Sequence, residues 1–103
     1  ILVGWTTTEK REQAEQLAEA LVRNRLAACV QVSGPIRSFY RWEGKAESDE
    51  EFRVTVKFAS SAAEKLERFL HDHHPYTTPQ WVAVKAESVA PGYRDWVIEE
   101  SAG

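Results

Sequence analysis

Two parts of the sequence carry side chains that bind soft or borderline metal ions. One is the single cysteine, Cys29, and the other is the run His71-Asp72-His73-His74. Thiolate and imidazole ligands suit copper in particular. His71 and His74 are spaced i, i+3, so they could face the same way on a helix. Together these residues make a metal site one hypothesis for the chemistry of this chain.

Both parts also have a purely structural interpretation, and the sequence leaves it open. Free cysteine is among the most often buried residue types, and Cys29 stands next to Val30 in an apolar stretch. Imidazoles near the C-terminus of a helix interact favourably with its dipole. One thiol cannot complete a closed tetrahedral site, so a site within one chain would need histidines as well.

Four acidic residues stand close together at Glu47, Asp49, Glu50 and Glu51. They could be paired carboxylates for acid-base chemistry or ligands for a hard cation, or they could be a solvated strand edge that blocks edge-to-edge pairing. The sequence has no Gly-rich phosphate loop, no GxSxG turn and no HExxH helix. We therefore expect no catalysis and no organic cofactor.

Length and composition predict one soluble domain over residues 1–103. The formal net charge of -3 argues against nucleic acid as a partner, although aromatic residues on an open sheet face would suit an RNA-recognition domain.

No apolar run is long enough to cross a membrane, and we expect no membrane partner. One cysteine excludes an internal disulfide, which agrees with a reducing compartment and a cytoplasmic location.

Hydrophobic periodicity predicts the first half of the chain. Residues 1–5 are an apolar strand, and the hydroxyls of residues 6–8 are expected to cap the helix that follows. From Glu9 the spacing of apolar residues is helical. A β-branched stretch over 27–32 predicts a strand that breaks at residues 33–35 and continues through Trp42. The alternation of apolar and polar residues over 52–58 predicts the strand that pairs with it in antiparallel fashion. Residues 43–45 supply the tight turn of this long hairpin. The apolar helical positions are Ala14, Leu17, Ala18, Leu21, Val22 and Leu26.

The second half repeats the pattern. Ser60 and Glu64 are spaced as a capping box for an amphipathic helix that ends near His74. Residues 81–85 are predicted to form a fourth strand. A last short helix is predicted after Pro91, with Tyr93, Trp96 and Val97 on one side. The order βαββαβ predicts an α+β, ferredoxin-like (split βαβ) fold, with two helices on one face of a four-stranded antiparallel sheet and an extra C-terminal helix.

Three aromatic residues near the hairpin turn, Phe39, Tyr40 and Trp42, have no cover in this arrangement. The two helices protect only one sheet face, and a hairpin from Ile36 to Phe58 is longer than a compact four-stranded sheet needs. We expect its outer half to project from the subunit and to pack on another subunit.

The sequence resembles the CutA family of divalent-cation tolerance proteins. The motifs that carry the resemblance are residues 25–30 (RLAACV), 34–45 (GPIRSFYRWEGK), 51–57 and 74–76 with Pro79, and the likeness spans residues 1 to about 101. It implies a homotrimer with the architecture of the trimeric PII signalling proteins, built through the hairpins and the sheet edges. FYRWEGK would then be the hairpin tip, packed between subunits.

The resemblance also implies a function and a set of site residues. Family members are associated with tolerance to copper and other divalent cations, so Cu(II) or another divalent cation is the implied ligand, bound without catalysis. Cys29 matches the family's Ala-Ala-Cys-Val stretch. This chain has Thr6 and Phe69 where some members carry further cysteines, so a site would need Cys29, a histidine such as His74, or ligands from neighbouring subunits. Positions implied to line the clefts between subunits are Tyr40, Trp42, Glu51, Lys57, His74 and Tyr76.

Two alternatives stay open beside this hypothesis. One is a PII-like sensor or scaffold that binds a small anionic ligand in the cleft between subunits through Lys57 or arginine residues. The other is an enzyme that works in the same cleft with Glu51, Lys57 and Tyr76.

Overall fold

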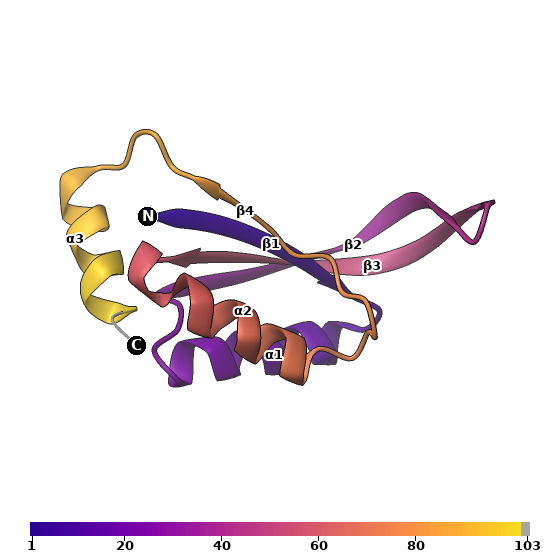
Figure 1. Ribbon diagram of the computed structural model, residues 1–103, viewed down its shortest axis with the longest axis horizontal. Coiled ribbons are helices and arrows are strands. Elements are labelled where there is room, and N and C mark those ends of the chain that lie inside the picture. The colour runs from indigo at the N-terminus through magenta and orange to yellow at the C-terminus, as the bar shows by residue number, and fades with distance from the viewer. Residues whose placement is uncertain (102–103) are drawn as a thin grey trace.

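A four-stranded antiparallel sheet, in the order β2-β3-β1-β4, forms one layer of the computed structural model, which describes residues 1–101 (Figure 1). Helices α1 and α2 lie side by side on one face of this sheet, and α3 packs at its end (Figure 1). The elements are β1 (Leu2–Thr8), α1 (Arg11–Arg23), β2 (Cys29–Trp42), β3 (Lys45–Phe58), a 3-10 turn η1 (Ser60–Ala62), α2 (Ala63–His73), β4 (Val82–Lys85) and α3 (Pro91–Glu100). The predicted ferredoxin-like α+β fold is confirmed.

The core lies between the sheet and the two helices. On β3 the even-numbered residues face the helices, and Val54, Val56 and Phe58 are at most 1% exposed. They meet apolar side chains from one face of each helix, which is the face that the helical spacing predicts, except that Val22 is 44% exposed. The buried helix residues are Ala14, Leu17 and Leu21 of α1 and Leu66 and Leu70 of α2.

The start of α1 differs from the prediction. Thr6, Thr7 and Thr8 do not cap the helix but complete β1, where their side chains are at most 6% exposed. β-branched residues suit a strand, and each hydroxyl has a partner there: Thr8 Oγ1, for example, donates to the Lys10 carbonyl at 2.9 Å. The helix begins only at Arg11, and the Lys10 backbone N–H donates to Gln13 Oε1 at 3.0 Å.

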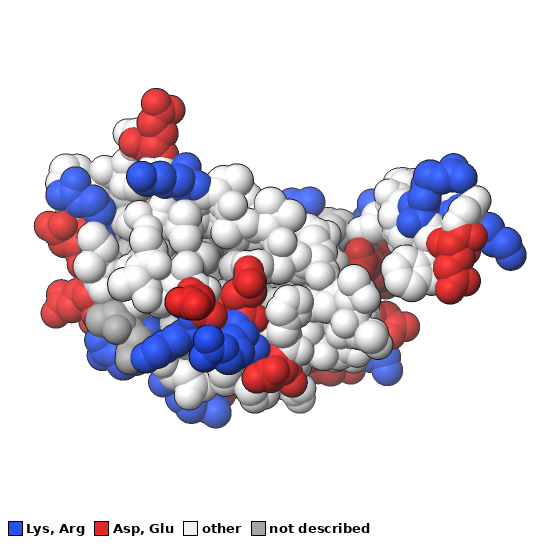
Figure 2. All heavy atoms as spheres, viewed as in Figure 1, with Lys and Arg blue, Asp and Glu red and all other residues white. Residues whose placement is uncertain are grey.

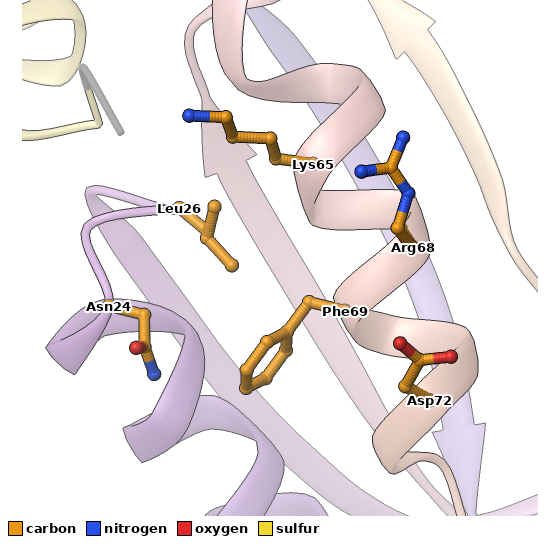
Figure 3. A pocket seen from close by; sticks show the side chains of 6 residues that line it. All are labelled: Asn24, Leu26, Lys65, Arg68, Phe69 and Asp72. Carbon is orange, nitrogen blue, oxygen red and sulfur yellow. The ribbon is translucent and has the colours of Figure 1, made fainter.

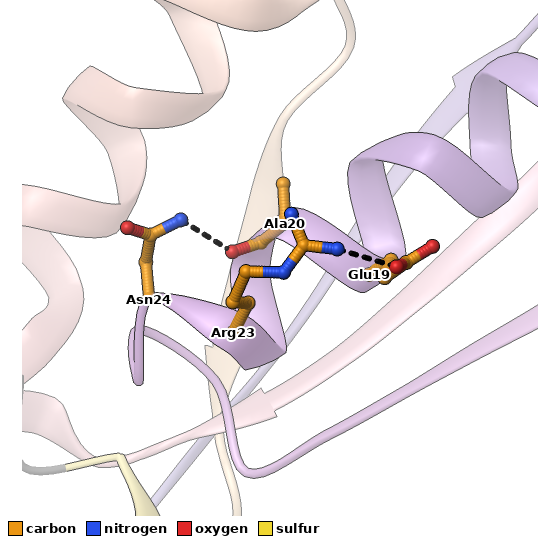
Figure 4. Close-up of polar contacts among 4 residues, drawn as sticks. All are labelled: Glu19, Ala20, Arg23 and Asn24. Atoms are coloured by element: carbon orange, nitrogen blue, oxygen red, sulfur yellow. Dashed lines mark hydrogen bonds and ion pairs between the residues drawn. The ribbon is translucent and has the colours of Figure 1, made fainter.

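The end of α1 is fixed by local polar contacts (Figure 4). Asn24 Nδ2 donates to the Ala20 carbonyl at 2.8 Å, and Arg23 pairs with Glu19 one turn earlier (Figure 4). Arg25 then takes a left-handed conformation with φ 58° and ends the helix. Leu26 is buried as the apolar spacing predicts, but it lies beyond the helix.

The β2–β3 hairpin is the longest feature of the molecule. Each strand has 14 residues, the register shifts between Ser33 and Ile36, and the turn has φ 49° at Glu43 and φ 79° at Gly44. The predicted break at residues 33–35, the turn and the projection are therefore confirmed. The outer end stands apart from the body and carries cationic and anionic side chains together (Figure 2). Its aromatic residues are exposed: Phe39 78%, Tyr40 42% and Trp42 56%.

In the second half of the chain, the start of α2 differs from the prediction. Ser60 and Glu64 do not form a capping box: Ser60 begins η1, and α2 starts at Ala63 without a side-chain cap. The buried Ser101 hydroxyl instead accepts a hydrogen bond from the Ala59 backbone N–H at 2.8 Å, which holds the end of α3 against this junction. Within residues 1–101, no helix has the length and hydropathy needed to span a membrane.

Candidate functional site

A groove of about 1200 Å³ runs along the outer half of the hairpin. One wall comes from β2 and β3 at residues 38–42 and 49–51, and the other comes from residues 76–80, which connect α2 to β4. Thr7, Glu9 and Lys10 line the end near the body. The groove exists because β1 ends at Thr8 while its neighbour β3 continues in the hairpin, so β3 has no partner strand on this side.

Glu51 joins the two walls of the groove. Its Oε2 atom accepts hydrogen bonds from the Tyr76 hydroxyl at 2.8 Å and from the Thr7 hydroxyl at 3.1 Å. Burial, together with the hydrogen bond to Glu51, raises the pKa of Tyr76 above its ordinary value, so this phenol stays protonated and remains a donor. These contacts hold residues 76–80 against the strand that carries the hairpin.

His74 lies under this connection with both ring nitrogens engaged. Nδ1 is 3.0 Å from the Tyr76 backbone N–H and must accept from it, so the ring proton is on Nε2, which donates to Thr6 Oγ1 at 2.9 Å. Burial lowers the pKa of His74 and favours the neutral ring. A metal ion could therefore use this imidazole only after displacing one of the two bonds.

The hairpin side of the groove carries Tyr40 and Trp42. The Tyr40 hydroxyl donates to the Asp49 carboxylate across the two strands, and this hydrogen bond is the main reason that the pKa of Tyr40 rises to about 12. Trp42 lies two residues further along the same face of β2. The structure thus brings four of the predicted cleft residues, Tyr40, Trp42, Glu51 and Tyr76, to one groove.

Lys57 and Cys29 lie outside the groove, at the other end of the sheet. They are paired in the β2–β3 register and face the side that α1 and α2 leave uncovered. Lys57 Nζ donates to Gln31 Oε1 at 3.3 Å and lies 5.8 Å from the centroid of the Tyr93 ring. Burial, and then the neighbouring Cys29 thiol, raises the pKa of Tyr93.

The structure separates the two predicted metal ligands. His74 bonds to Thr6, whose partner in β3 is Val54 on the helix-covered face. Cys29 pairs with Lys57 three residues further along β3, and an odd offset places it on the opposite face. Within residues 1–101, no group of three or more His, Cys, Asp or Glu side chains is arranged to hold a metal ion. One subunit alone does not supply the predicted site.

A smaller hollow of about 400 Å³ lies between the end of α1 and α2 (Figure 3). Leu26 and Phe69 form its apolar part, and Lys65, Arg68 and Asp72 stand around its rim (Figure 3). Both signs of charge are present at this rim. None of the predicted site residues lies in it.

Sequence reasoning missed Thr6, Thr7 and Glu9 as parts of the site. The three threonines are of a residue type that caps helices, but a β-branched run after an apolar strand also indicates that the strand continues. No signal in the sequence pairs Thr6 with His74 or Thr7 with Glu51, because these partners are 68 and 44 residues apart.

Residues 2–100 match the model of the family described as "CutA1 divalent ion tolerance protein". The chain belongs to this family. It is 38% identical over 95 residues to the divalent-cation tolerance protein CutA of Thermus thermophilus, covering 92% of each chain. Its structure is similar to that of the divalent cation tolerance protein (Cut A1) from the same organism, with a TM-score of 0.94, 37% identity and 97% of each chain covered.

Relatives also occur in animals. The mouse protein CutA is 35% identical over 97 residues, which are 94% of this chain. This chain spans 55% of the length of the mouse protein.

Proposed function

We propose that this protein is a non-catalytic, homotrimeric metal-response protein that binds Cu(II) or another divalent cation. The observation that carries the proposal is its membership of a family of divalent ion tolerance proteins over residues 2–100. We further propose that the site is formed between subunits, with Cys29 and His74 as candidate ligands. Cys29 is the chain's one thiol, and soft ligands favour copper.

Exposed apolar surface supports the trimer. Phe39 and Trp42 on the hairpin have more than half of their surface exposed, and Val82 and Val84 of β4 are about half exposed on the uncovered sheet face. β2 and β4 are the two edge strands of the sheet, and free strand edges favour pairing with another chain. Copies of the same chain would cover all of these features at once.

The separation of the candidate ligands also favours a shared site. Cys29 and His74 lie on opposite faces of one sheet, so a copper ion bound by both would need them from different subunits. The proposed location is the cytoplasm, which agrees with a single free thiol.

The anionic-ligand alternative has less support. Its proposed cation, Lys57, lies away from the groove and already donates to Gln31. The groove itself is lined by four carboxylates and one lysine. An anion would be repelled there unless a neighbouring subunit contributed more positive charge.

The test is a titration of the purified protein with Cu(II) against a competing chelator. We expect binding at a fixed ratio per trimer, weakened about tenfold or more by Cys29→Ser and by His74→Gln, with His71→Gln as the control on the exposed surface of α2. Uptake without a fixed ratio, or uptake equal in all four proteins, would contradict the proposal. Light scattering measures the mass of each variant in solution and so shows whether a variant that loses copper binding is still a trimer.

A further inference from the structure

The hollow between α1 and α2 lies on a part of the surface that the proposed trimer leaves open. The two helices cover one face of the sheet, whereas another subunit would cover the hairpin, the edge strands β2 and β4 and the opposite sheet face (Figure 1). The volume of the hollow is about 400 Å³, which is within the range of sites for small organic molecules. A ligand can therefore reach it both in one subunit and in the assembly.

The apolar part of the hollow is held in place by contacts within the chain. Leu26 is 6% exposed, and its backbone N–H donates to a carbonyl in the last turn of α1 at 3.0 Å. Arg25 ties the same loop to α3, because its guanidinium donates to the Glu99 carbonyl at 2.8 Å. Phe69 lies opposite Leu26 on α2 (Figure 3), and its ring stacks on that of His73 with 3.9 Å between the centroids. An apolar surface is thus formed before any ligand binds.

Three charged side chains surround this apolar surface. Lys65 and Arg68 lie in the first two turns of α2, and Asp72 lies in its last turn (Figure 3). None of the salt bridges among residues 1–101 includes any of the three. Lys65 and Arg68 are spaced i, i+3 and so lie on neighbouring turns of one helix face. Both cations can therefore reach the same anionic group of a ligand.

The order of these charges along α2 selects the class of ligand. A carboxylate near Lys65 and Arg68 would meet two cations, and a guanidinium group matches its geometry. The rest of the ligand would then lie on Phe69 and extend toward Asp72. A second negative charge at that end would be repelled by Asp72. The arrangement favours one carboxylate on an apolar body over a dicarboxylate, a cation or an inorganic anion.

We propose that this hollow binds a small organic carboxylate with a single negative charge and an apolar body. Its carboxylate pairs with Lys65 and Arg68, and its apolar body packs on Leu26 and Phe69. The inference goes beyond the proposed function, because the hollow contains neither of the candidate copper ligands and is complete within one subunit.

The test uses phenylacetate and three probes that each change one property. The alcohol 2-phenylethanol keeps the ring without the charge, acetate keeps the charge without the ring, and para-phenylenediacetate adds a second carboxylate. Each is titrated into the purified protein, and binding is followed by NMR at the Asn24 side-chain amide and the Leu26 methyl groups. We expect saturable shifts with phenylacetate, and an affinity about fivefold or more higher than that of any other probe. Added salt should weaken phenylacetate.

Variants locate the site. Arg68→Gln removes one cation and Phe69→Leu removes the ring, so each should weaken phenylacetate about two- to fivefold. Asp72→Asn removes the nearby negative charge and should strengthen phenylacetate about twofold. Arg94→Gln on α3 is the matched control for the loss of a cation and should leave the affinity unchanged. Thermal unfolding of each variant shows whether the fold is kept.

Several results would overturn the inference. These are an absence of saturation with phenylacetate, equal affinity for phenylacetate and 2-phenylethanol, tighter binding of acetate or of the diacid, or a folded Arg68→Gln variant with unchanged affinity. The copper titration and light scattering are run on the same samples. A copper-binding trimer that does not bind phenylacetate removes only this inference. A protein that binds phenylacetate in the hollow but neither assembles nor binds copper removes only the proposed function.

Discussion

At the scale of single residues, the contacts of His74 could not be predicted from the short histidine motif that contains it. The run of histidines predicted either a metal ligand or a favourable charge at a helix C-terminus. In the structure His74 is 9% exposed and held between Thr6 and the Tyr76 backbone, and burial lowers its pKa, which favours the neutral ring. Its partner Thr6 comes from the far end of the sequence, so local spacing cannot reveal it.

The neutral state of His74 predicts a pH dependence of stability. Its folded-state pKa lies below the unfolded value of about 6.5, so the unfolded chain binds the proton more readily. The free energy of unfolding of the metal-free protein should therefore fall as the pH is lowered from about 7 through the folded-state pKa. Urea denaturation at several pH values between 7 and 5 measures this change.

The matched variants for this prediction are His74→Asn and His71→Asn. His74→Asn should be less stable at pH 7, because it loses the buried contacts to Thr6 and Tyr76, and it should lose most of the slope with pH. His71→Asn, exposed on α2, should keep the slope. An unchanged slope in His74→Asn would mean that other groups cause the dependence.

At the scale of elements, periodicity predicted the structure wherever one face is buried. The alternation over residues 52–58 and the helical spacing before Leu21 both reflect direct contact with the core. The errors lie at the boundaries. Thr6, Thr7 and Ser60 are residue types that cap helices, but Thr6 and Thr7 instead contact His74 and Glu51. Ser60 begins η1 next to Ala59, whose backbone N–H donates to Ser101.

The backbone conformation of the hairpin turn leads to a prediction about the stability of a variant at Gly44. Glu43 and Gly44 both have positive φ, which is the pattern of a tight two-residue turn. Gly44→Ala has open space around its new methyl group but a strained backbone, so it should lower the free energy of unfolding by about 1 kcal/mol. Thermal unfolding measures the change.

Gly92→Ala is the control for this effect. It also adds a methyl group in open space, but within α3 and without a positive φ. It should be neutral or stabilising by a few tenths of a kcal/mol, because alanine is the better helix former. Equal effects at Gly44 and Gly92 would show that backbone strain at the turn is not the cause.

At the scale of the whole molecule, the uncovered aromatic residues of the sequence predict a partner that packs on the hairpin. Phe39, Tyr40 and Trp42 lie on the projecting hairpin of a molecule that is 44 Å long and only 22 to 25 Å across. Four of the residues predicted to line a cleft, Tyr40, Trp42, Glu51 and Tyr76, lie in one groove. Lys57 lies elsewhere, because it is further along β3 than Glu51, at the end of the sheet where it pairs with Cys29.

Native mass spectrometry during a Cu(II) titration tests the central claim most directly, because it counts chains and metal ions in the same particle. The account predicts one species at three times the 11.7 kDa of the single chain, which takes up a fixed number of copper ions. A particle at the mass of one chain would contradict it, and so would a trimer that takes up copper in no fixed number.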